Sequence, residues 1–196
     1  AKKELLHLGN YAVKAFDLSY DYIINSNEKV AEKGHKTEEA INTIDEKLTR
    51  YLITLSSEAL SQKESEVLTN ILDSSRDLER IGDHAEALIN LNDYLQRKNV
   101  HFSSSALEEL EDIYRQTSEF VKDALESVEN NDLEMAESLI ERHEAINKME
   151  RVLRKTHIKR LNNGECSTQA GVNFIDIISH YTRVSDHAMN LAEKVL

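Results

Sequence analysis

Acidic side chains at helical spacing are the residues of this sequence best suited to chemistry. Glu79 and Asp83 are four residues apart, and so are Asp73 and Asp77. Residues four apart project from the same side of an α-helix. Two carboxylates one turn apart repel each other unless a cation lies between them. Mg²⁺ takes such oxygen ligands, and iron, manganese or zinc will also accept imidazole. The stretch therefore predicts a cation site, in which Arg80 is a competing charge.

The same stretch recurs about a hundred residues further along the chain. Arg80–Ala85 reads Arg-Ile-Gly-Asp-His-Ala, and Arg183–Ala188 reads Arg-Val-Ser-Asp-His-Ala. Glu39–Asn42 likewise recurs letter for letter as Glu144–Asn147. This period is too long for a solenoid, whose repeats are roughly 20–50 residues. The sequence therefore predicts two fused copies of one small bundle, with domains at residues 1–100 and 101–196.

The second copy carries fewer acids than the first. Asp176 and Asp186 match acids of the first copy, but His180 and Thr182 stand where the first copy has carboxylates. The candidate ligands, which include one glutamate from the second helix of each copy, are Glu79, Asp83, Asp77, Asp73, Glu39, Asp186, His180, Asp176 and Glu144.

Helices are expected nearly throughout, because apolar residues recur in steps of three and four. One such stripe consists of Ile41, Ile44, Leu48, Tyr51 and Leu55. The chain has no proline and only five glycines, which favours long helices joined by short connectors. We predict an all-α fold of two tandem three-helix bundles. Its six long antiparallel helices are expected at about 2–25, 27–60, 63–98, 105–129, 132–162 and 168–196.

Local signals place some of the helix boundaries. Ser61, Ser105 and Asn131 each precede an acid by three residues, as capping residues do. Gly34 could mark a break in the second helix. However, its counterpart in the repeat is Leu139, well inside a helix. We therefore predict one continuous helix, in which Gly34 costs about 1 kcal/mol.

The overall composition limits the partners. The 24 basic and 36 acidic residues give a formal net charge of −12, which argues against nucleic acid because phosphate binding needs a basic surface. No apolar run approaches the roughly 18 residues of a membrane span. The single cysteine, Cys166, cannot form an internal disulfide and suits a reducing cytosol. The chain begins at Ala1 without a start Met, as a processed terminus or the soluble end of a longer protein would.

The repeated segment also carries a family resemblance. Leu78–Ala85 reads Leu-Glu-Arg-Ile-Gly-Asp-His-Ala and resembles the signature of the PhoU family. The duplicated three-helix layout is that family's architecture, so the resemblance covers nearly the whole chain. The first helix, together with Thr49–Ser56, is most similar to the PhoU-like cytosolic tail of bacterial sodium/phosphate cotransporters. A free-standing PhoU is the close alternative.

The resemblance implies a function and a set of ligands. It implies a non-enzymatic regulatory domain of phosphate homeostasis that modulates phosphate transport or its signalling. Some members hold iron or other metals on faces with the pattern Glu/Asp-x-x-x-Asp, which Glu79 and Asp83 match. In the second copy Asp186 matches this pattern but Thr182 does not, and a site made of Asp176, His180 and Asp186 would bind a hard cation more weakly. The resemblance therefore predicts two unequal metal sites, with the first repeat the stronger. The cofactors would then be Fe, Mn, Zn or Mg ions. The partner would be the membrane domain of a phosphate transporter, in the same chain or another, or a phosphate-signalling protein. We expect a cytoplasmic position at the inner face of the cell membrane, and a homo-oligomer also fits.

Other functions remain as alternatives. The main one is a helical protein-interaction scaffold without a functional metal, in which pairs such as Arg80 and Asp83 bridge neighbouring helices. A ferritin-like di-iron enzyme needs Glu-x-x-His on two helices. Glu4–His7 and Glu32–His35 have that spacing, but neither recurs in the second copy. A phosphohydrolase of the His-Asp type is disfavoured because the repeated histidines follow their aspartates rather than precede them.

Overall fold

The chain folds into six long helices and contains no strand. The computed structural model describes residues 1–196. The helices are α1 (Lys2–Asn25), α2 (Glu28–Ser56), α3 (Gln62–Arg97), α4 (Ser104–Asn130), α5 (Leu133–Asn162) and α6 (Thr168–Glu193). These bounds confirm the predicted all-α fold, and each lies within four residues of the predicted one.

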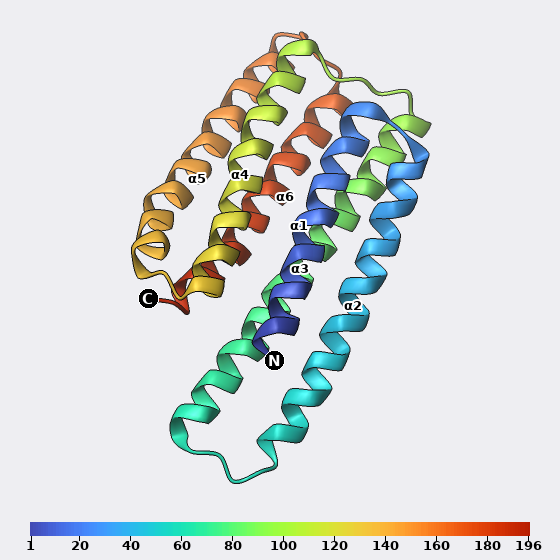
Figure 1. Ribbon diagram of the computed structural model, residues 1–196. Helices are drawn as coiled ribbons and strands as arrows, with labels where there is room; N and C mark the ends of the chain where they lie inside the picture. Colours follow the sequence, from blue (N-terminus) through green and yellow to red (C-terminus); the bar gives the residue numbers. More distant parts are fainter.

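The six helices form two three-helix bundles that lie side by side (Figure 1). In the first bundle α1, α2 and α3 pack against one another, and in the second α4 and α6 pack together with α5. The bundles meet through contacts of α3 with α6 and of α1 with α4. The α2–α3 hairpin extends beyond the start of α1 (Figure 1). The two acid-bearing helices, α3 and α6, are therefore both in the centre of the molecule.

Side chains cap the starts of five helices. Ser61 forms the predicted capping box with Glu64 at the start of α3. The starts of α4 and α5 differ from the prediction, because Ser103 and Asp132 are the capping residues. Asn131 instead ends α4 in the left-handed conformation, with φ of 54°. Asparagine tolerates this backbone geometry better than most residues.

The hydrophobic core is continuous between the bundles. The largest fully buried side chains include Phe16 of α1, Phe120 of α4 and Tyr181 of α6. Phe16 and Tyr181 meet edge to face across the bundle contact, with ring centroids 5.4 Å apart. Aromatic pairs in this geometry add to the stabilisation from buried area.

Two glycines allow α2 and α3 to approach closely. Gly34 lies inside α2, as predicted, and a Cβ atom there would overlap the side chain of Ile89 on α3. On α3, a Cβ atom at Gly82 would lie 2.9 Å from Cδ1 of Ile41. Both positions face the neighbouring helix, so the helix propensity lost at glycine is offset by tighter packing.

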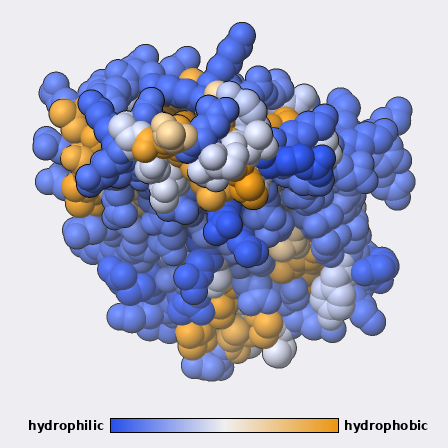
Figure 2. Space-filling model, turned by 90° about the horizontal axis from the view of Figure 1, so that it is seen from below, coloured by the Kyte–Doolittle hydropathy of each residue, from blue (hydrophilic) through white to orange (hydrophobic).

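The surface is mostly hydrophilic, with apolar patches at one end. Figure 2 shows such patches on the end to which the α2–α3 hairpin extends. An apolar groove at this end, bordered by Ala1, is lined by Leu52, Leu55, Leu60, Val67, Leu68 and Ile71. None of the helices is both long enough and apolar enough to cross a lipid bilayer.

Candidate functional site

An acidic cluster lies between α2 and α3 in the first bundle. Its carboxylates interact electrostatically across the two helices, which pack against each other along their length. We define the first-repeat cluster as Glu38 and Asp45 of α2 with Glu79, Asp83 and Glu86 of α3.

Burial and mutual repulsion make the first-repeat cluster costly to ionise. Glu38 is buried, with 7% of its surface exposed. Burial and the charges of Glu86 and Asp83 raise its pKa, although Asn42 donates a hydrogen bond to it. Burial and the charge of Asp83 likewise raise the pKa of Glu79, despite the opposing effect of Arg80. A cation placed among these groups would relieve their repulsion.

The compensating contacts of the first-repeat cluster come mostly from exposed groups. Nδ1 of His35 lies 3.3 Å from Oε1 of Glu86, and these side chains are 37% and 39% exposed. The Ser75 hydroxyl donates a hydrogen bond to Asp45 with an O···O distance of 2.5 Å. Arg80 donates to Asp83 at 3.1 Å, and its Nε lies 3.8 Å from Glu79. Its side chain is 63% exposed, so water screens this charge. No cation from the protein lies within ion-pair distance of Glu38 or Asp45.

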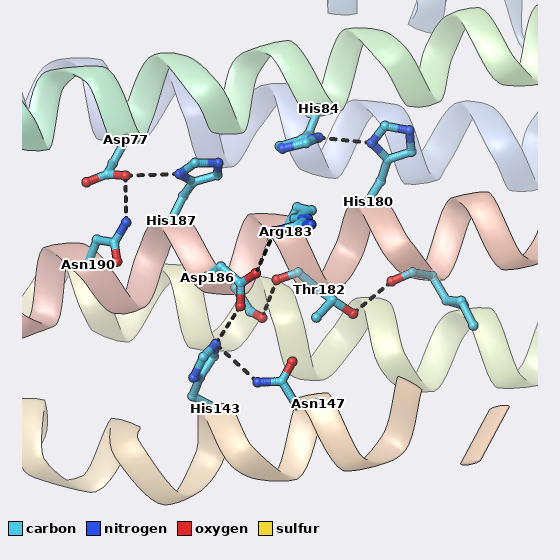
Figure 3. A network of polar contacts seen from close by, with 12 residues as sticks. Asp77, His84, His143, Asn147, His180, Thr182, Arg183, Asp186, His187 and Asn190 are labelled. Carbon is cyan, nitrogen blue, oxygen red and sulfur yellow. Dashed lines mark hydrogen bonds and ion pairs between the residues drawn. The ribbon is translucent and has the colours of Figure 1, made fainter. Parts of the chain in front are cut away.

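On the equivalent face of the second bundle, an imidazole of the adjacent helix is the partner of the remaining aspartate. His143 of α5, at the position of Glu38, lies with Nε2 2.9 Å from Oδ1 of Asp186 on α6. Thr182, at the position of Glu79, donates a hydrogen bond to the Ile178 carbonyl of its own helix at 3.0 Å. Figure 3 shows His143 and Asp186 pointing toward each other across α5 and α6.

An arginine compensates the remaining buried acid of the second bundle. Glu150, which is 8% exposed, accepts hydrogen bonds from Nε and Nη2 of Arg154 at 2.7 and 2.5 Å. Arg154 also donates to the Ser179 hydroxyl of α6 at 2.8 Å. The position of Arg154 is occupied in the first repeat by Thr49. The two repeats therefore differ in how their acids are compensated.

A second polar group lies where α3 meets α6, between the bundles. Asp77 accepts hydrogen bonds from His187 Nδ1 and from Asn190, both at 2.9 Å, and Lys194 lies 3.4 Å away. Burial raises the pKa of Asp77, but these partners together lower it below its ordinary value. The equivalent positions of the other repeat also contact each other. There Nδ1 of His84 and Nδ1 of His180 are 2.9 Å apart (Figure 3).

The prediction chose two glutamates that lie one residue away from the side chains that face the adjacent helix. Glu39 and Glu144 are exposed. Their neighbours Glu38 and His143 face the adjacent helix instead. One residue corresponds to a rotation of about 100° on a helix. The sequence did contain a signal for the face that meets the adjacent helix. Polar residues with the same spacing occupy this face in both repeats: Glu38, Asn42 and Asp45 in the first, and His143, Asn147 and Glu150 in the second.

The structure brings only part of the remaining predicted set together. Glu79 and Asp83 share one face, as predicted. The predicted grouping in the second repeat is wrong, because His180 contacts α3, Asp186 contacts α5 and Asp176 is exposed. In the first repeat Asp77 faces α6 and Asp73 is exposed, so neither joins Glu79 and Asp83.

The repeated Arg–Asp pairs do not bridge helices. Arg80 pairs with Asp83 within α3, and Arg183 lies 3.7 Å from Asp186 within α6. This overturns the bridging role given to them in the scaffold alternative. Nowhere in the chain are three or more His, Cys, Asp or Glu side chains already arranged to ligate one ion. Metal binding by the first-repeat cluster would therefore require carboxylates to rotate toward the ion.

Comparison with known proteins assigns the family. The PhoU domain model matches residues 5–91 and 110–195, one match in each bundle. The chain is 30% identical to PhoU homolog 1, a phosphate-specific transport system accessory protein of Thermotoga maritima, over 91% of this chain and 68% of that protein. Its fold is similar to that of PhoU from Pseudomonas aeruginosa, with a TM-score of 0.90 and 20% identity over 98% and 92% of the two chains. PhoU from Streptococcus pneumoniae has a TM-score of 0.87 and 20% identity over 98% and 90%. The chain belongs to the PhoU family.

Proposed function

We propose that this protein regulates phosphate transport as an accessory protein, without catalysing a reaction itself. The observation that supports this most directly is the similarity to an accessory protein of a phosphate-specific transport system, which is 30% identical over 91% of this chain. The proposed partner is a phosphate transporter in the membrane or its signalling protein, met at the cytoplasmic face. The named relatives favour such an accessory role over the tail of a sodium/phosphate cotransporter.

A gene deletion tests the regulatory role. We expect cells without the protein to take up labelled phosphate at a changed rate in phosphate-rich medium, and the wild-type gene to restore uptake. Unchanged uptake, together with unchanged expression of phosphate-responsive genes, would contradict the proposal.

We further propose that the first-repeat cluster binds a cation and the second repeat does not. Glu38, Asp45, Glu79 and Asp83 supply the carboxylate oxygens that Mg²⁺ or Mn²⁺ would require, and iron or zinc would also accept them. The raised pKa values of Glu38 and Glu79 support this, because burial and then repulsion from neighbouring carboxylates cause them, and a bound cation would remove the repulsion. Arg154 and His143 give the second repeat its own compensating groups.

A matched pair of substitutions tests the cation site. Protein purified without an affinity tag is treated with EDTA, and thermal unfolding is followed with and without Mn²⁺ or Fe²⁺. A cation that binds only the folded state at about 100 times its Kd stabilises it by about 2.7 kcal/mol. Asp83→Asn should remove this stabilisation, whereas Asp186→Asn, the same change in the second repeat, should leave it. Equal losses in both variants would contradict unequal sites.

The alternative function is a helical scaffold that docks a basic partner through the acidic face. It is favoured by the absence of a preformed set of three ligands. The experiment above separates the two functions. If no metal ion copurifies and none changes the melting temperature, the scaffold explains the protein better.

A further inference from the structure

A row of carboxylate and imidazole groups crosses the contact between the bundles. In order it consists of Asp77 of α3, His187 of α6, His84 of α3 and His180 of α6 (Figure 3). The outer contacts, Asp77 to His187 and His84 to His180, each measure 2.9 Å and use Nδ1 of both central histidines. The Nε2 atoms of His84 and His187 have no hydrogen-bond partner in the protein, and Figure 3 shows them turned toward each other.

The spacing of the two central rings suits a shared metal ion. Their centroids are 5.6 Å apart, with 34° between the ring planes. Two imidazoles that ligate one tetrahedral ion at about 2.0–2.1 Å have ring centres about 5–6 Å apart. We propose that His84 and His187 together bind a borderline divalent cation of the Zn²⁺ class at the bundle contact, with water completing its coordination. Imidazole is a favoured ligand of Zn²⁺, Cu²⁺ and Ni²⁺.

The outer groups of the row orient the ligands. A histidine that binds a metal through one nitrogen usually donates its other N–H to a carboxylate, which fixes the ring and its tautomer. Asp77 stands in this position behind His187, and it is held by Asn190 at 2.9 Å. Behind His84, Nδ1 of His180 accepts a hydrogen bond in the same way when Nδ1 of His84 carries the proton.

The positive charges near the two histidines are too exposed to prevent a cation from binding there. The guanidinium groups of Arg80 and Arg183 oppose it, but both side chains are largely exposed, at 63% and 70%. Each is also paired with an aspartate of its own helix. The carboxylate of Asp77 is only 14% exposed and adds a negative charge behind His187. This site lies on the α6-facing side of α3, so it is separate from the first-repeat cluster, which faces α2.

Zinc titration of matched variants tests the site. The protein carries Glu38→Gln and Glu79→Gln to disable the first-repeat cluster, is treated with EDTA, and competes for Zn²⁺ with a chromophoric chelator at neutral pH. We expect one Zn²⁺ per chain, and His84→Gln or His187→Gln should weaken its binding at least about tenfold. His101→Gln, a change at an exposed histidine, should have no effect. Unaltered affinity in both the His84 and His187 variants would overturn the proposal.

A spectroscopic measurement does not depend on any histidine variant folding. With one equivalent of Cu²⁺, the EPR spectrum of the same protein should show nitrogen couplings from two imidazoles, and couplings from one or none would overturn the assignment. Asp77→Asn provides the check on orientation. It should weaken Zn²⁺ binding by about 10–100-fold without removing a ligand, and an unchanged affinity would count against the site as described.

Discussion

Replacing His180 by Asp should stabilise the contact between the two bundles. Asp77 and His187 of one pair correspond, at the repeat offset of 103 residues, to His180 and His84 of the other. The first pair joins a carboxylate to an imidazole at 2.9 Å, whereas the second joins two imidazoles. An aspartate at residue 180 would therefore give His84 the partner that His187 already has, from a backbone position equivalent to that of Asp77.

The magnitude follows from the environment of His84. Burial, together with the charges of His180, His187, Arg183 and Arg80, lowers its pKa from 6.5 to about 4. A difference of about 2.5 in pKa corresponds to about 3 kcal/mol, which solvent screening of this partly exposed group reduces to about 1.5 kcal/mol. Repulsion between the new carboxylate and Asp176, one turn away, costs about 0.2–0.5 kcal/mol. The net gain of about 1 kcal/mol applies in acid, near pH 5, where the protonation of His84 differs between the folded and unfolded states, and it raises Tm by about 2–4 °C in a chain of this size.

The gain should depend on pH. The pKa of His84 is lower in the folded protein than in the unfolded chain, so the unfolded chain binds more protons in acid. The stability that neutral His84 contributes is complete above about pH 6.5 and is lost as the pH falls toward about 4. A carboxylate at residue 180 would raise the folded pKa and remove this loss. The difference in Tm between His180→Asp and the wild type should therefore grow between pH 8 and pH 5.

Thermal unfolding in EDTA, followed by circular dichroism at pH 5 and pH 8, measures the effect. The control is the same substitution in a His84→Gln background, which closes a double-mutant cycle. The acid-dependent gain should vanish without His84. A Tm at pH 5 no higher than that of the wild type, or a gain that persists in the His84→Gln background, would refute the reasoning.

Three further predictions concern packing and charge within each bundle. Arg154→Ala should lower the free energy of unfolding by about 3 kcal/mol in urea titrations, because it leaves the carboxylate of Glu150 buried and unpaired; a change below about 1 kcal/mol, typical of a surface pair, would contradict this. Gly34→Ala should destabilise by about 1–3 kcal/mol in the same assay, since its methyl group would overlap Ile89, and a gain in stability would show that α2 and α3 can separate freely. Glu38→Gln should raise Tm of the EDTA-treated protein at neutral pH, where repulsion on the wild-type carboxylate is greatest, while abolishing any Tm increase caused by Mn²⁺; a lower Tm without metal would contradict the assigned repulsion.

The helical framework could be predicted because its signals are local or repeated. Apolar steps of three and four residues indicated helices nearly throughout the chain, and the capping pattern at Ser61 marked the start of α3. The repeat also decided the case of Gly34, which local propensity alone would have made a break. Its reason for being glycine is tertiary, because Ile89 of another helix occupies the space where a Cβ would lie. Position in the repeat was therefore a better guide than propensity.

The acidic face was harder to predict because identity between repeats marked the wrong residues. Glu39 and Glu144 are identical but exposed, whereas Glu38 and His143 differ and face the neighbouring helix. On this face, Glu38 and Glu79 of the first repeat are replaced in the second by His143 and Thr182. Identity after duplication therefore did not identify the facing side, which requires the rotation of each helix about its axis.

The bundle contact could not be predicted from the pattern at all. Asp77 and His84 are seven residues apart and so share one face of α3, as His180 and His187 do on α6. That spacing shows a shared face but not its partner. Which helix lies opposite depends on how two complete bundles dock, and three-helix bundles offer several faces for docking.

The second repeat serves as an internal reference for the first. Both copies use the same helical layout. In the second copy His143 takes the place of Glu38, and Arg154 compensates the charge of Glu150. The layout can therefore supply partners for its acidic side chains. The first repeat has Thr49 at the position of Arg154 and keeps a buried Glu38, whose pKa is raised by burial and by the charges of its neighbours. This repulsion lowers the stability of the folded first repeat, although a histidine at the position of Glu38, as in the second repeat, would remove it. This contrast between two copies of one fold is the strongest reason to assign cation binding to the first repeat alone.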